Sequence, residues 1–520
     1  MQGIGESIEA ELQSLRMDGH SPRHQELLRR IGPGVLELIQ VNGLGMKRLQ
    51  TLFNEVGIKD ISQLKKACFD GSLLRLQHFG AGVVKKLIGE IEHWERTKGK
   101  RYPLPEAKGL ADSIRQQLAS LDYVDRAVVG GSIRRGRETI GDIDILITTD
   151  DAKRASDYFK RMPEAVEVIF DGNTRASIRV VGGIQVDLRA LDVNAFGAGL
   201  HYFTGSKLHH IRMRIRSKRM GLKISEKGVV PYEDPDSGPI GPMDTETQIF
   251  NAVGLPYIPP EIRMGKKEIE LAEQGKLPTL LDASMLLGDM HIHTKSSGGR
   301  TSLDRMAEKA SKLGYQWVVV AERSRGLHPK GLNNDEMRKH FKKIREVGSL
   351  HGVRLIAGAE VGIDLQGMFD IHHRVLAQCD FVIGRLTGRE DADAEENTQR
   401  ITWALETGLM SCLGSPTGRH LGVNSGYDLY FDEIVRTCID FGVALEMNAH
   451  PNQLDLNQKL AGRVKELGGL IMLGSNAGSV IGMENISYAI QQARRAWFVE
   501  GDVLNSKPID DILGELMRLK

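Results

Sequence analysis

Two aspartates stand two residues apart, at Asp142 and Asp144, in the segment GGSIRRGRETIGDIDILI. The pattern here is that of a strand, so both carboxylates project from one face. Carboxylates held this close repel each other unless divalent cations neutralise them. Asp187, in IQVDLRAL, has apolar neighbours, and a metal ion is the natural partner for an acid in such surroundings. Three acids on adjacent strands predict a site for two Mg²⁺ or Mn²⁺ ions that activate a hydroxyl and hold phosphates.

The residues before the aspartate pair suit a triphosphate. Gly131 and its neighbour Gly130 leave their backbone N–H groups unhindered, and Ser132 adds a hydroxyl. Cations follow at Arg134, Arg135 and Arg137. The alternative interpretation is a strand-edge turn with solvated acids. That alternative does not explain why a phosphate-binding loop and the acids occur together.

Composition limits the classes of protein that fit this chain. Its 520 residues allow about three or four domains, and 69 Lys and Arg against 68 Asp and Glu exclude neither nucleic acid nor acidic small substrates. The four cysteines form no CxxC pair, which argues against zinc fingers and against a disulfide-built secreted domain. The N-terminus lacks a signal-peptide pattern, and no apolar run is long enough to span a membrane. We therefore expect a soluble cytoplasmic protein with no membrane partner.

The elements that must position these residues change in character along the chain. Residues 1–100 have the pattern of short amphipathic helices separated by Gly-x-Gly pairs. Val- and Ile-rich runs between 120 and 192 predict a mixed sheet. Positions 206–223 form a helical pattern with seven Lys or Arg and no acid, which favours phosphate binding over a merely solvated face. From 287 to 520, apolar strand runs alternate with helical patterns, as in a parallel α/β barrel.

Three segments resemble the family X DNA polymerases, in the bacterial form that fuses a polymerase to a PHP domain. GGSIRRGRETIGDIDILI is similar to the family's nucleotidyltransferase motif, IQVDLRAL to its third-acid strand, and HYFTGSKLHHIRMRIRSKRMGLKISEKGVV to its nucleotide-binding subdomain. The resemblance covers nearly the whole chain. It implies an α-helical helix-hairpin-helix region at 1–100, an α+β polymerase-beta-like palm at 101–193, a helical and β nucleotide-binding subdomain at 194–262, a linker at 263–286 and a C-terminal α/β PHP barrel at 287–520.

The resemblance also implies roles around the three acids. Asp142 and Asp144 would bind both metals, and Asp187 the metal that faces the primer 3′-hydroxyl. The phosphates of the incoming nucleotide would be held by Gly131, Ser132, Arg135 and the backbone of Gly141.

Further roles fall in the nucleotide-binding subdomain. Tyr202 and Phe203 would lie against the incoming sugar, next to a close turn at Gly205, a crowding by which a DNA polymerase rejects a 2′-hydroxyl. Arg214 falls where the family reads the minor groove of the template strand. His210 stands where the family usually has an asparagine that touches the incoming base, which is a departure from its pattern.

The Gly-x-Gly pairs in VNGLGMKRLQTLF and HFGAGVVKKLIG match helix-hairpin-helix elements, whose backbone N–H groups can hold a DNA phosphate, often through a monovalent cation. A glycine pair between helices can also be a simple C-cap. The expected DNA-binding residues here are Gly43, Gly45, Lys47, Gly80 and Gly82. Relatives begin with a further helical segment, so this region is expected to be short at its N-terminus. Aligning Gly3 and Gly5 places Glu11 where lyase relatives carry the lysine that forms a Schiff base, so we expect no lyase activity from this position.

GDMHIHT at 288–294 resembles the first motif of PHP domains, barrels that bind metals for phosphoester hydrolysis. The residual ligands are His291, His293 and Glu360. Glu322 replaces an aspartate and Arg323 a histidine, and the other ligand positions hold Thr387, Ser415, Asn476 and Gly478. An arginine among the ligands adds a fixed cation, which opposes divalent ion binding. We therefore expect a retained structural or DNA-contacting scaffold rather than a 3′-5′ exonuclease.

These observations predict a gap-filling DNA polymerase of base excision repair that acts on primer-template or gapped DNA with dNTPs. We expect a monomer in the bacterial cytoplasm, associated with the nucleoid. A PHP phosphoesterase such as a histidinol phosphatase is disfavoured by the lost ligands. A nucleotidyltransferase for tRNA or a small molecule is disfavoured by the tandem hairpins and YFTGS, and a non-catalytic DNA-binding scaffold by the intact acids.

Overall fold

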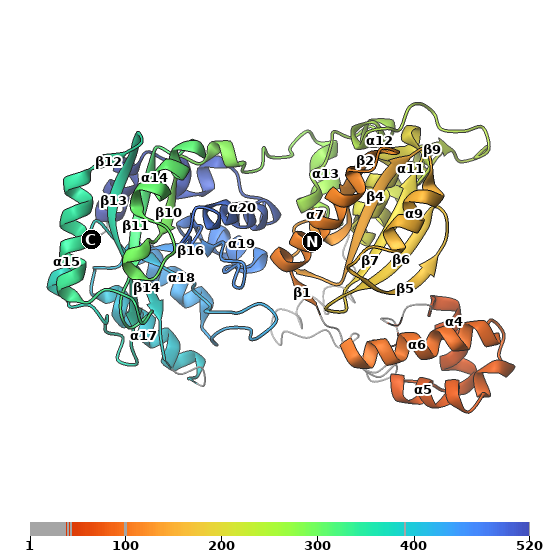
Figure 1. The fold of residues 1–520 in the computed structure, drawn as a ribbon, viewed down its shortest axis with the longest axis horizontal. Helices are drawn as coiled ribbons and strands as arrows, with labels where there is room; N and C mark the ends of the chain where they lie inside the picture. The colour runs from red at the N-terminus through yellow and green to blue at the C-terminus, as the bar shows by residue number, and fades with distance from the viewer. Residues whose placement is uncertain are drawn as a thin grey trace, which may run out of the picture. The chain divides into compact units, whose positions relative to one another are not determined.

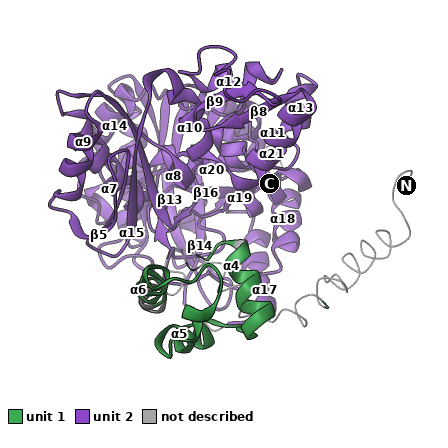
Figure 2. Ribbon diagram, turned by 90° about the vertical axis from the view of Figure 1, so that its right-hand side faces the viewer, with its two compact units in different colours: residues 1–100 green, residues 101–520 purple. Residues whose placement is uncertain are grey.

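The computed structural model describes residues 44–97, 101–388 and 392–518, together with Glu26, Leu38 and Val41. The chain divides into two compact units, residues 1–100 and residues 101–520 (Figure 2). No helix in the described segments is long and apolar enough to cross a membrane. The four cysteines all lie in these segments, and none of them forms a disulfide.

The described part of the first unit consists of short helices. They are α4 (Met46–Thr51), the π-helical turn η1 (Leu52–Val56), α5 (Ile61–Phe69), the 3₁₀ turn η2 (Ser72–Arg75) and α6 (Ala81–Thr97). Asp60 begins α5 by accepting a hydrogen bond of 2.8 Å from the N–H of Gln63. Leu52, Leu64 and Phe79 are fully or almost fully buried in a core that the helices share. The helical pattern predicted for this region is confirmed where the structure describes it.

A five-stranded mixed sheet carries the predicted acids. Its strands are β2 (Val124–Val129), β4 (Asp142–Thr149), β5 (Ala165–Asp171), β6 (Arg175–Val180) and β7 (Gln185–Leu191), in the order β2-β4-β7-β6-β5 (Figure 1). Strands β4 and β7 are parallel neighbours, whereas the other pairs are antiparallel. This confirms the mixed sheet.

Two helices cover one face of this sheet. Alternate apolar residues of β4, such as Ile143 and Ile145, share a core with α7 (Leu104–Ala119) and α9 (Ala152–Lys160). Because side chains alternate along a strand, Asp142 and Asp144 lie on the other face. The short helix α8 (Gly131–Arg134) and the strand pair β1 (Tyr102–Pro103) and β3 (Thr139–Ile140) complete this part of the chain.

The next subdomain has a separate core. Its elements are η3 (Val193–Ala195), α10 (Phe196–Thr204), α11 (Lys207–Arg219), β8 (Leu222–Ser225), β9 (Gly228–Pro231), α12 (Glu246–Ala252) and η4 (Pro260–Ile262). The stretch interpreted as a linker contains α13 (Glu268–Glu273) and η5 (Ala283–Met285). Ile269 and Ala272 of α13 are buried in the same core as Phe250 of α12. Part of the connector therefore packs as an element of this subdomain.

The C-terminal region is a nearly closed barrel of parallel strands. The strands β10 (Gly288–Ile292), β11 (Trp317–Arg323), β13 (Val353–Ile363), β14 (Phe381–Leu386), β15 (Cys412–Leu413), β16 (Ala444–Asn448) and β17 (Ile471–Gly474) pair in chain order, and β12 (Ser349–Leu350) pairs antiparallel with β13. A parallel bridge between Ile292 and Ala477 joins the two ends of the series. The parallel α/β barrel is thus confirmed.

Helices surround the barrel: α14 (Leu303–Lys312), α15 (Asn334–Val347), α16 (His373–Leu376), α17 (Ala394–Glu406), α18 (Phe431–Asp440), α19 (Gln458–Leu467), α20 (Ile486–Arg495) and α21 (Ile509–Arg518), with short turns η6 (Lys295–Ser297), η7 (Gly482–Asn485), η8 (Glu500–Asp502) and η9 (Leu504–Ser506). Val318 and Val320 of β11 pack outward with the surrounding helices. Trp317 and Val319 point inward and share an interior core with Ile512 of α21. Side chains thus fill the interior, and the carboxyl ends of the strands remain to carry a site.

Candidate functional site

The three predicted acids come together at neighbouring strands. In the parallel register of β4 and β7, Asp144 stands opposite Asp187 and Asp142 opposite Gln185. Gln185 orients the buried Asp187 carboxylate by donating a hydrogen bond of 2.9 Å from Nε2 to Oδ1. Desolvation and then the charges of Asp142 and Asp187 raise the pKa of Asp144 to about 7. Desolvation and Asp187 also raise the pKa of Asp142. Such mutual repulsion is what a divalent cation relieves.

The glycine-rich loop lies directly against these acids. Gly131 has φ +58°, and a Cβ atom there would overlap the Asp144 carboxylate. The N–H of Gly130 donates a hydrogen bond of 2.8 Å to the carbonyl of Asp144, which fixes the loop to β4. Ser132 Oγ is buried and has no hydrogen-bond partner in the described segments. A buried hydroxyl without a partner at the start of α8 fits a phosphate oxygen.

The loop arginines have different tasks. Arg135 Nη1 donates to the carbonyl of Thr204, which joins the loop to the YFTG turn, and its charge interacts with Asp144 and Asp142. Arg134 instead donates to Thr204 Oγ1 at 2.7 Å and to the buried Glu246 at 2.6 Å. The expectation that Arg134 supplies charge to a triphosphate is therefore not favoured, because its guanidinium is already paired.

Residues predicted to surround the nucleotide meet at the end of α10. The rings of Tyr202 and Phe203 lie 5.1 Å apart edge to face, and the Arg214 guanidinium lies 5.8 Å from the Tyr202 ring centroid. Gly205 has φ +70°, and a Cβ atom there would come within 3.1 Å of Arg135 Nη1. The turn thus needs glycine both for its conformation and for the close approach of Arg135.

The side chain of His210 is held by backbone carbonyl groups. Its ring is buried, and Nε2 lies 2.7 Å from the carbonyl oxygen of Tyr202 and 3.1 Å from that of His201. Burial lowers the pKa of His210 to about 4, so the ring is neutral at pH 7. The structure therefore ties this side chain to the end of α10, and a contact with the incoming base stays a prediction.

Two arginines near the acids were missed by sequence reasoning. Arg189 lies two residues after Asp187 on the same strand face, and its guanidinium is 5.0 Å from the Phe203 ring centroid. Arg101 donates to Thr139 Oγ1 at 2.8 Å, and a Cβ atom at Gly141 would come within 3.4 Å of Arg101 Nη1. The spacing of two could have indicated Arg189, but Arg101 stands far from the motif in sequence.

The basic helix is less free than its composition suggested. Arg212 pairs with Glu270, and Arg216 pairs with Glu273, both on α13. The sequence pattern contains no acid within the helix, but the acids come from the stretch interpreted as a linker. The remaining cations of this helix, among them Lys207 and Arg214, form no ion pair with a described carboxylate.

No three His, Cys, Asp or Glu side chains form a ready-made metal cluster anywhere in the described parts of the chain. The three acids nevertheless fit Mg²⁺, which usually takes one or two carboxylates together with substrate phosphates and water. Asp142, Asp144 and Asp187 supply the oxygen donors, and the hydroxyl of Ser132, which has no partner among the described residues, would be available to a phosphate. The donor set fits ions that bind together with a nucleotide.

The helix-hairpin-helix residues in the described part of the first unit present backbone to solvent. Gly45, Gly80 and Gly82 are exposed, and so is Lys47 on α4. The N–H groups at the start of α6 are available to an anion, because a helix leaves its first N–H groups without internal partners. Gly3, Gly5, Glu11 and Gly43 lie outside the described residues.

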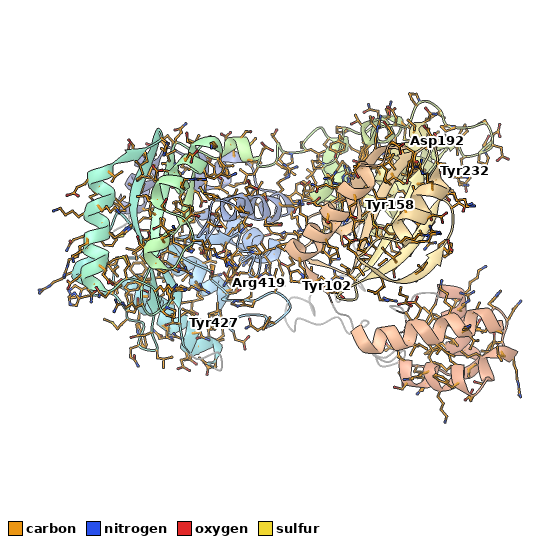
Figure 3. The ribbon with its side chains drawn as sticks, in the orientation of Figure 1. Tyr102, Tyr158, Asp192, Tyr232, Arg419 and Tyr427 are labelled. Carbon is orange, nitrogen blue, oxygen red and sulfur yellow. The ribbon has the colours of Figure 1, made fainter. Side chains whose placement is uncertain are left out.

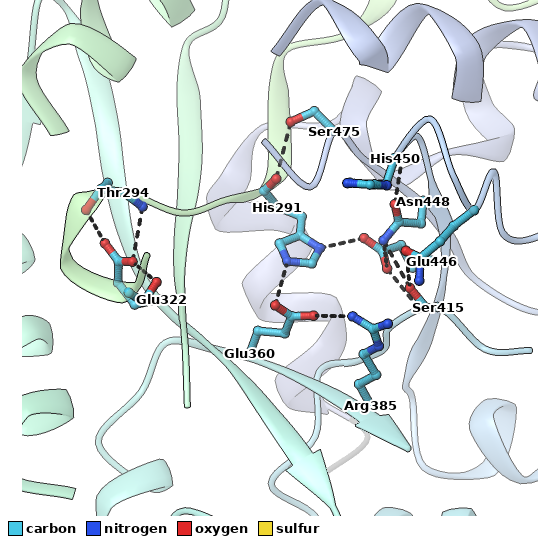
Figure 4. Close-up of polar contacts among 12 residues, drawn as sticks. His291, Thr294, Glu322, Glu360, Arg385, Ser415, Glu446, Asn448, His450 and Ser475 are labelled. Carbon is cyan, nitrogen blue, oxygen red and sulfur yellow. Dashed lines mark hydrogen bonds and ion pairs between the residues drawn. The ribbon is translucent and has the colours of Figure 1, made fainter. Parts of the chain in front are cut away.

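In the barrel, the residual ligand His291 is surrounded by carboxylates rather than by an open metal position. Its Nδ1 lies 2.7 Å from Glu446 Oε1 and its Nε2 lies 3.5 Å from Glu360 Oε2 (Figure 4). Burial lowers the pKa of His291, but Glu446 and Glu360 outweigh it and raise that pKa to about 10. Sequence reasoning missed Glu446, although an acid inside the apolar run VALEMN is the same signal that indicated Asp187.

The other acid of the former cluster is also engaged. Glu322 accepts a hydrogen bond of 3.1 Å from the N–H of Thr294 and further hydrogen bonds from the hydroxyls of Thr294 and Ser297 (Figure 4). Thr387 Oγ1 donates to the carbonyl of Ile363 at 2.9 Å. Arg323 lines the cavity at the barrel mouth together with His293. These residues do not fit a metal cluster.

The barrel also touches the phosphate loop. Gln492 Nε2 of α20 donates to the carbonyl of Gly136 at 2.8 Å, and Arg495 Nη1 donates to that of Arg135 at 2.6 Å. Arg419, which is labelled in Figure 3, pairs through Nη1 with Glu138 at 2.8 Å. A cavity of about 570 Å³ lies at this junction, and its wall includes the cations Arg135, Arg137, Lys207, Lys459 and Arg495.

Comparisons with known proteins agree with both halves of this description. Residues 101–178 match the family described as DNA polymerase beta palm, and residues 199–264 match DNA polymerase beta thumb. The chain is 29% identical over 522 residues to the DNA polymerase/3′-5′ exonuclease PolX of Bacillus subtilis, covering 100% of this chain and 90% of that protein. It is 24% identical to DNA polymerase lambda of Rattus norvegicus over 50% of this chain and 47% of that one. A probable phosphatase of Edwardsiella ictaluri is 25% identical over 42% of this chain and 90% of its own length.

Proposed function

Because the chain belongs to family X of the DNA polymerases, in the bacterial form with a PHP domain, we propose that it fills gaps during DNA repair by two-metal nucleotidyl transfer. Family membership makes it a DNA-directed DNA polymerase. The observation that carries the mechanism is the register of β4 and β7, which sets Asp144 beside Asp187 with Gly131 against the same carboxylate.

The residues of the palm divide the work between metal and phosphate. Asp142, Asp144 and Asp187 would hold two divalent ions, Mg²⁺ or Mn²⁺, which when bound supply activation of the primer 3′-hydroxyl and charge for the phosphates. Ser132 Oγ and Arg135 would bind the β and γ phosphates, leaving the α-phosphate toward the acids. In-line attack by the hydroxyl then releases pyrophosphate.

The proposed substrate is gapped DNA with a dNTP. The exposed backbone at Gly45, Gly80 and Gly82 would bind DNA phosphates through a monovalent cation, and Arg214 would contact the template. The chain would act as a monomer in the bacterial cytoplasm, close to the nucleoid. The helix-hairpin-helix contacts are sequence-independent, which suits repair of gaps wherever they arise.

Gap filling is tested by comparing substrates. The full chain is given one dNTP with a one-nucleotide gap carrying a 5′-phosphate, or with an open primer-template of the same sequence. We expect faster single-nucleotide incorporation on the gap. Equal incorporation on both substrates would contradict a gap-filling role.

We further propose that the PHP domain acts as a scaffold and not as a nuclease. This proposal is supported by Glu322, whose carboxylate already accepts hydrogen bonds, and by Arg323 in the cavity where metals would bind. The contacts of α20 with the phosphate loop suggest that the scaffold supports that loop. The exonuclease in the name of the Bacillus subtilis relative is the competing possibility. We expect no metal-dependent release of 3′ nucleotides from single-stranded DNA by the wild type. Release that is lost in His291→Ala but kept in Asp187→Ala would overturn the proposal.

A further inference from the structure

A cavity of about 270 Å³ opens at the carboxyl ends of the barrel strands, where relatives with the full ligand set would hold metals. Two guanidinium groups line it, from Arg323 at the end of β11 and Arg385 on β14. Glu360 is the carboxylate in its wall, and His293 and His450 add imidazole rings. The cavity is therefore lined by cations and neutral donors more than by acids.

The acids around this cavity are already paired. Glu360 lies 3.5 Å from His291 Nε2 and 3.6 Å from Arg385 Nη1. Behind it, Glu446 binds His291 and accepts hydrogen bonds of 2.9 Å from the N–H of Ser415 and 3.0 Å from Asn448 Nδ2. Figure 4 shows that these contacts form one chain from Glu446 through His291 and Glu360 to Arg385. No carboxylate in this series of contacts is left to pair with Arg323.

The guanidinium of Arg323 has no hydrogen bond or ion pair with any residue that the structure describes, and its Nε is buried. His293 is only 5% exposed, and its Nδ1 is likewise buried without a partner. An N–H group of a cation and a ring nitrogen that are removed from water without partners cost free energy. Both side chains line the same cavity, so a ligand that accepts hydrogen bonds and carries negative charge would relieve both costs.

The shape of the hydrogen-bond donors limits which ligands fit the cavity. A guanidinium presents a planar fork that matches two oxygens of a phosphate. Arg323 offers such a fork, and Arg385, whose Nη1 lies 3.6 Å from Glu360, offers its remaining N–H groups. The cavity is slightly smaller than the roughly 300–1,000 Å³ of pockets that enclose whole small molecules, so it suits a phosphate group and not an entire nucleotide.

We propose that the degenerate metal site of the barrel is a metal-independent phosphate-binding site, in which Arg323 and Arg385 take the place of divalent ions. The ligand is a phosphate group, either free or at the end of a nucleotide or DNA strand. This site is separate from the proposed polymerase centre, and its occupancy does not depend on that function.

The test measures phosphate binding to the full chain in EDTA by titration calorimetry at constant ionic strength. The variants are Arg323→Gln and a matched control, Arg325→Gln, whose exposed side chain pairs with Glu336 outside the cavity. Phosphate that binds at the polymerase loop contributes equally to both. We expect Arg323→Gln to bind inorganic phosphate at least about tenfold more weakly than the wild type, and Arg325→Gln to match the wild type.

Further arms identify the source of the phosphate. A 5′-phosphorylated oligonucleotide, the same oligonucleotide without phosphate, and dCMP replace inorganic phosphate in turn. A loss in Arg323→Gln confined to the phosphorylated oligonucleotide assigns the site to DNA ends, and a loss confined to inorganic phosphate and dCMP assigns it to free phosphates. If Arg323→Gln does not fold, Arg385→Gln carries the same expectation. Wild-type affinity of the folded variant for all of these phosphate probes would overturn the proposal, as would Mn²⁺ binding that His291→Ala removes.

Discussion

At the scale of residues, the palm has a glycine, Gly131, at a position where a side chain would not fit. Gly131 combines a positive φ with direct contact against the Asp144 carboxylate. The glycine lets the phosphate loop approach the acids, so metal and phosphate ligands come to one place. The same loop leaves Ser132 Oγ buried without a partner among the described residues, as expected of a hydroxyl that binds a phosphate.

Gly131→Ala is therefore expected to reduce single-nucleotide incorporation by about 10²-fold or more, because the added methyl displaces Asp144. The measurement is single-turnover incorporation at saturating dNTP. Gly182→Ala is the matched control, since Gly182 also has positive φ, +94°, but an added Cβ would meet nothing within 4 Å. If both variants lose activity equally, backbone strain and not the close approach explains the effect.

Residue-scale chemistry was the most predictable part of the molecule. Asp142 and Asp144 share a face because side chains alternate along a strand, which depends only on local sequence. Asp187 could be identified because it is an acid in an otherwise apolar strand. Glu446 carries the same signal. The engagement of Glu322 by Thr294 and Ser297 could not be predicted, because these hydrogen bonds depend on how a turn closes onto a neighbouring strand.

At the scale of elements, one buried carboxylate joins the phosphate-loop helix to the nucleotide-binding subdomain. Glu246 on α12 pairs with Arg134 of α8 at 2.6 Å and with Arg263 at 2.5 Å, and Arg263 is fully buried. Burial raises the pKa of Glu246, but the two guanidinium groups outweigh it and lower that pKa to about 2. The acid is thus charged in the folded protein at all ordinary pH values.

Glu246→Gln is expected to destabilise the protein by about 3 kcal/mol at pH 7, because it leaves the buried Arg263 and the partly buried Arg134 without their charge partner. A depressed acid pKa gives stability that is present above the ordinary value of 4.5 and is lost as pH falls toward about 2. The difference between variant and wild type should therefore shrink below pH 4.5.

Thermal unfolding followed by circular dichroism at several pH values measures this difference in stability between Glu246→Gln and the wild type. Glu233→Gln, at an exposed acid of the same subdomain, is the control. A variant whose deficit stays constant from pH 7 to pH 3 would show that charge pairing is not its cause. Arg134 and Glu246 lie 112 residues apart in the chain, which is why periodicity alone could not predict their ion pair.

At the scale of the whole second unit, the barrel supports the polymerase loop. Gln492 is buried on α20 and donates to the carbonyl of Gly136, and Arg495 donates to that of Arg135. The barrel architecture itself followed from alternating strand and helix patterns. The docking of the barrel onto the loop did not, because these contacts join residues 356 and 360 positions apart in the chain.

Gln492→Ala is expected to raise the KM for dNTP several-fold with a smaller effect on kcat, because it frees the loop that would bind the phosphates and leaves the acids in place. Steady-state incorporation on gapped DNA measures both constants. Ser487→Ala, an exposed position of the same helix, is the control. An unchanged KM in Gln492→Ala would show that the barrel does not tune the loop.

The central claim is that Asp142, Asp144 and Asp187 are the acids of nucleotidyl transfer, and Asp187→Ala tests it most directly. Incorporation of one dNTP into gapped DNA is measured with Mg²⁺ or Mn²⁺, beside DNA binding and beside Asp122→Ala, an exposed palm aspartate 3.9 Å from Arg154. Loss of several kcal/mol of transition-state stabilisation predicts a decrease on the order of a thousandfold for Asp187→Ala, with DNA binding retained and Asp122→Ala unaffected. Incorporation by Asp187→Ala within tenfold of the wild type would contradict the account.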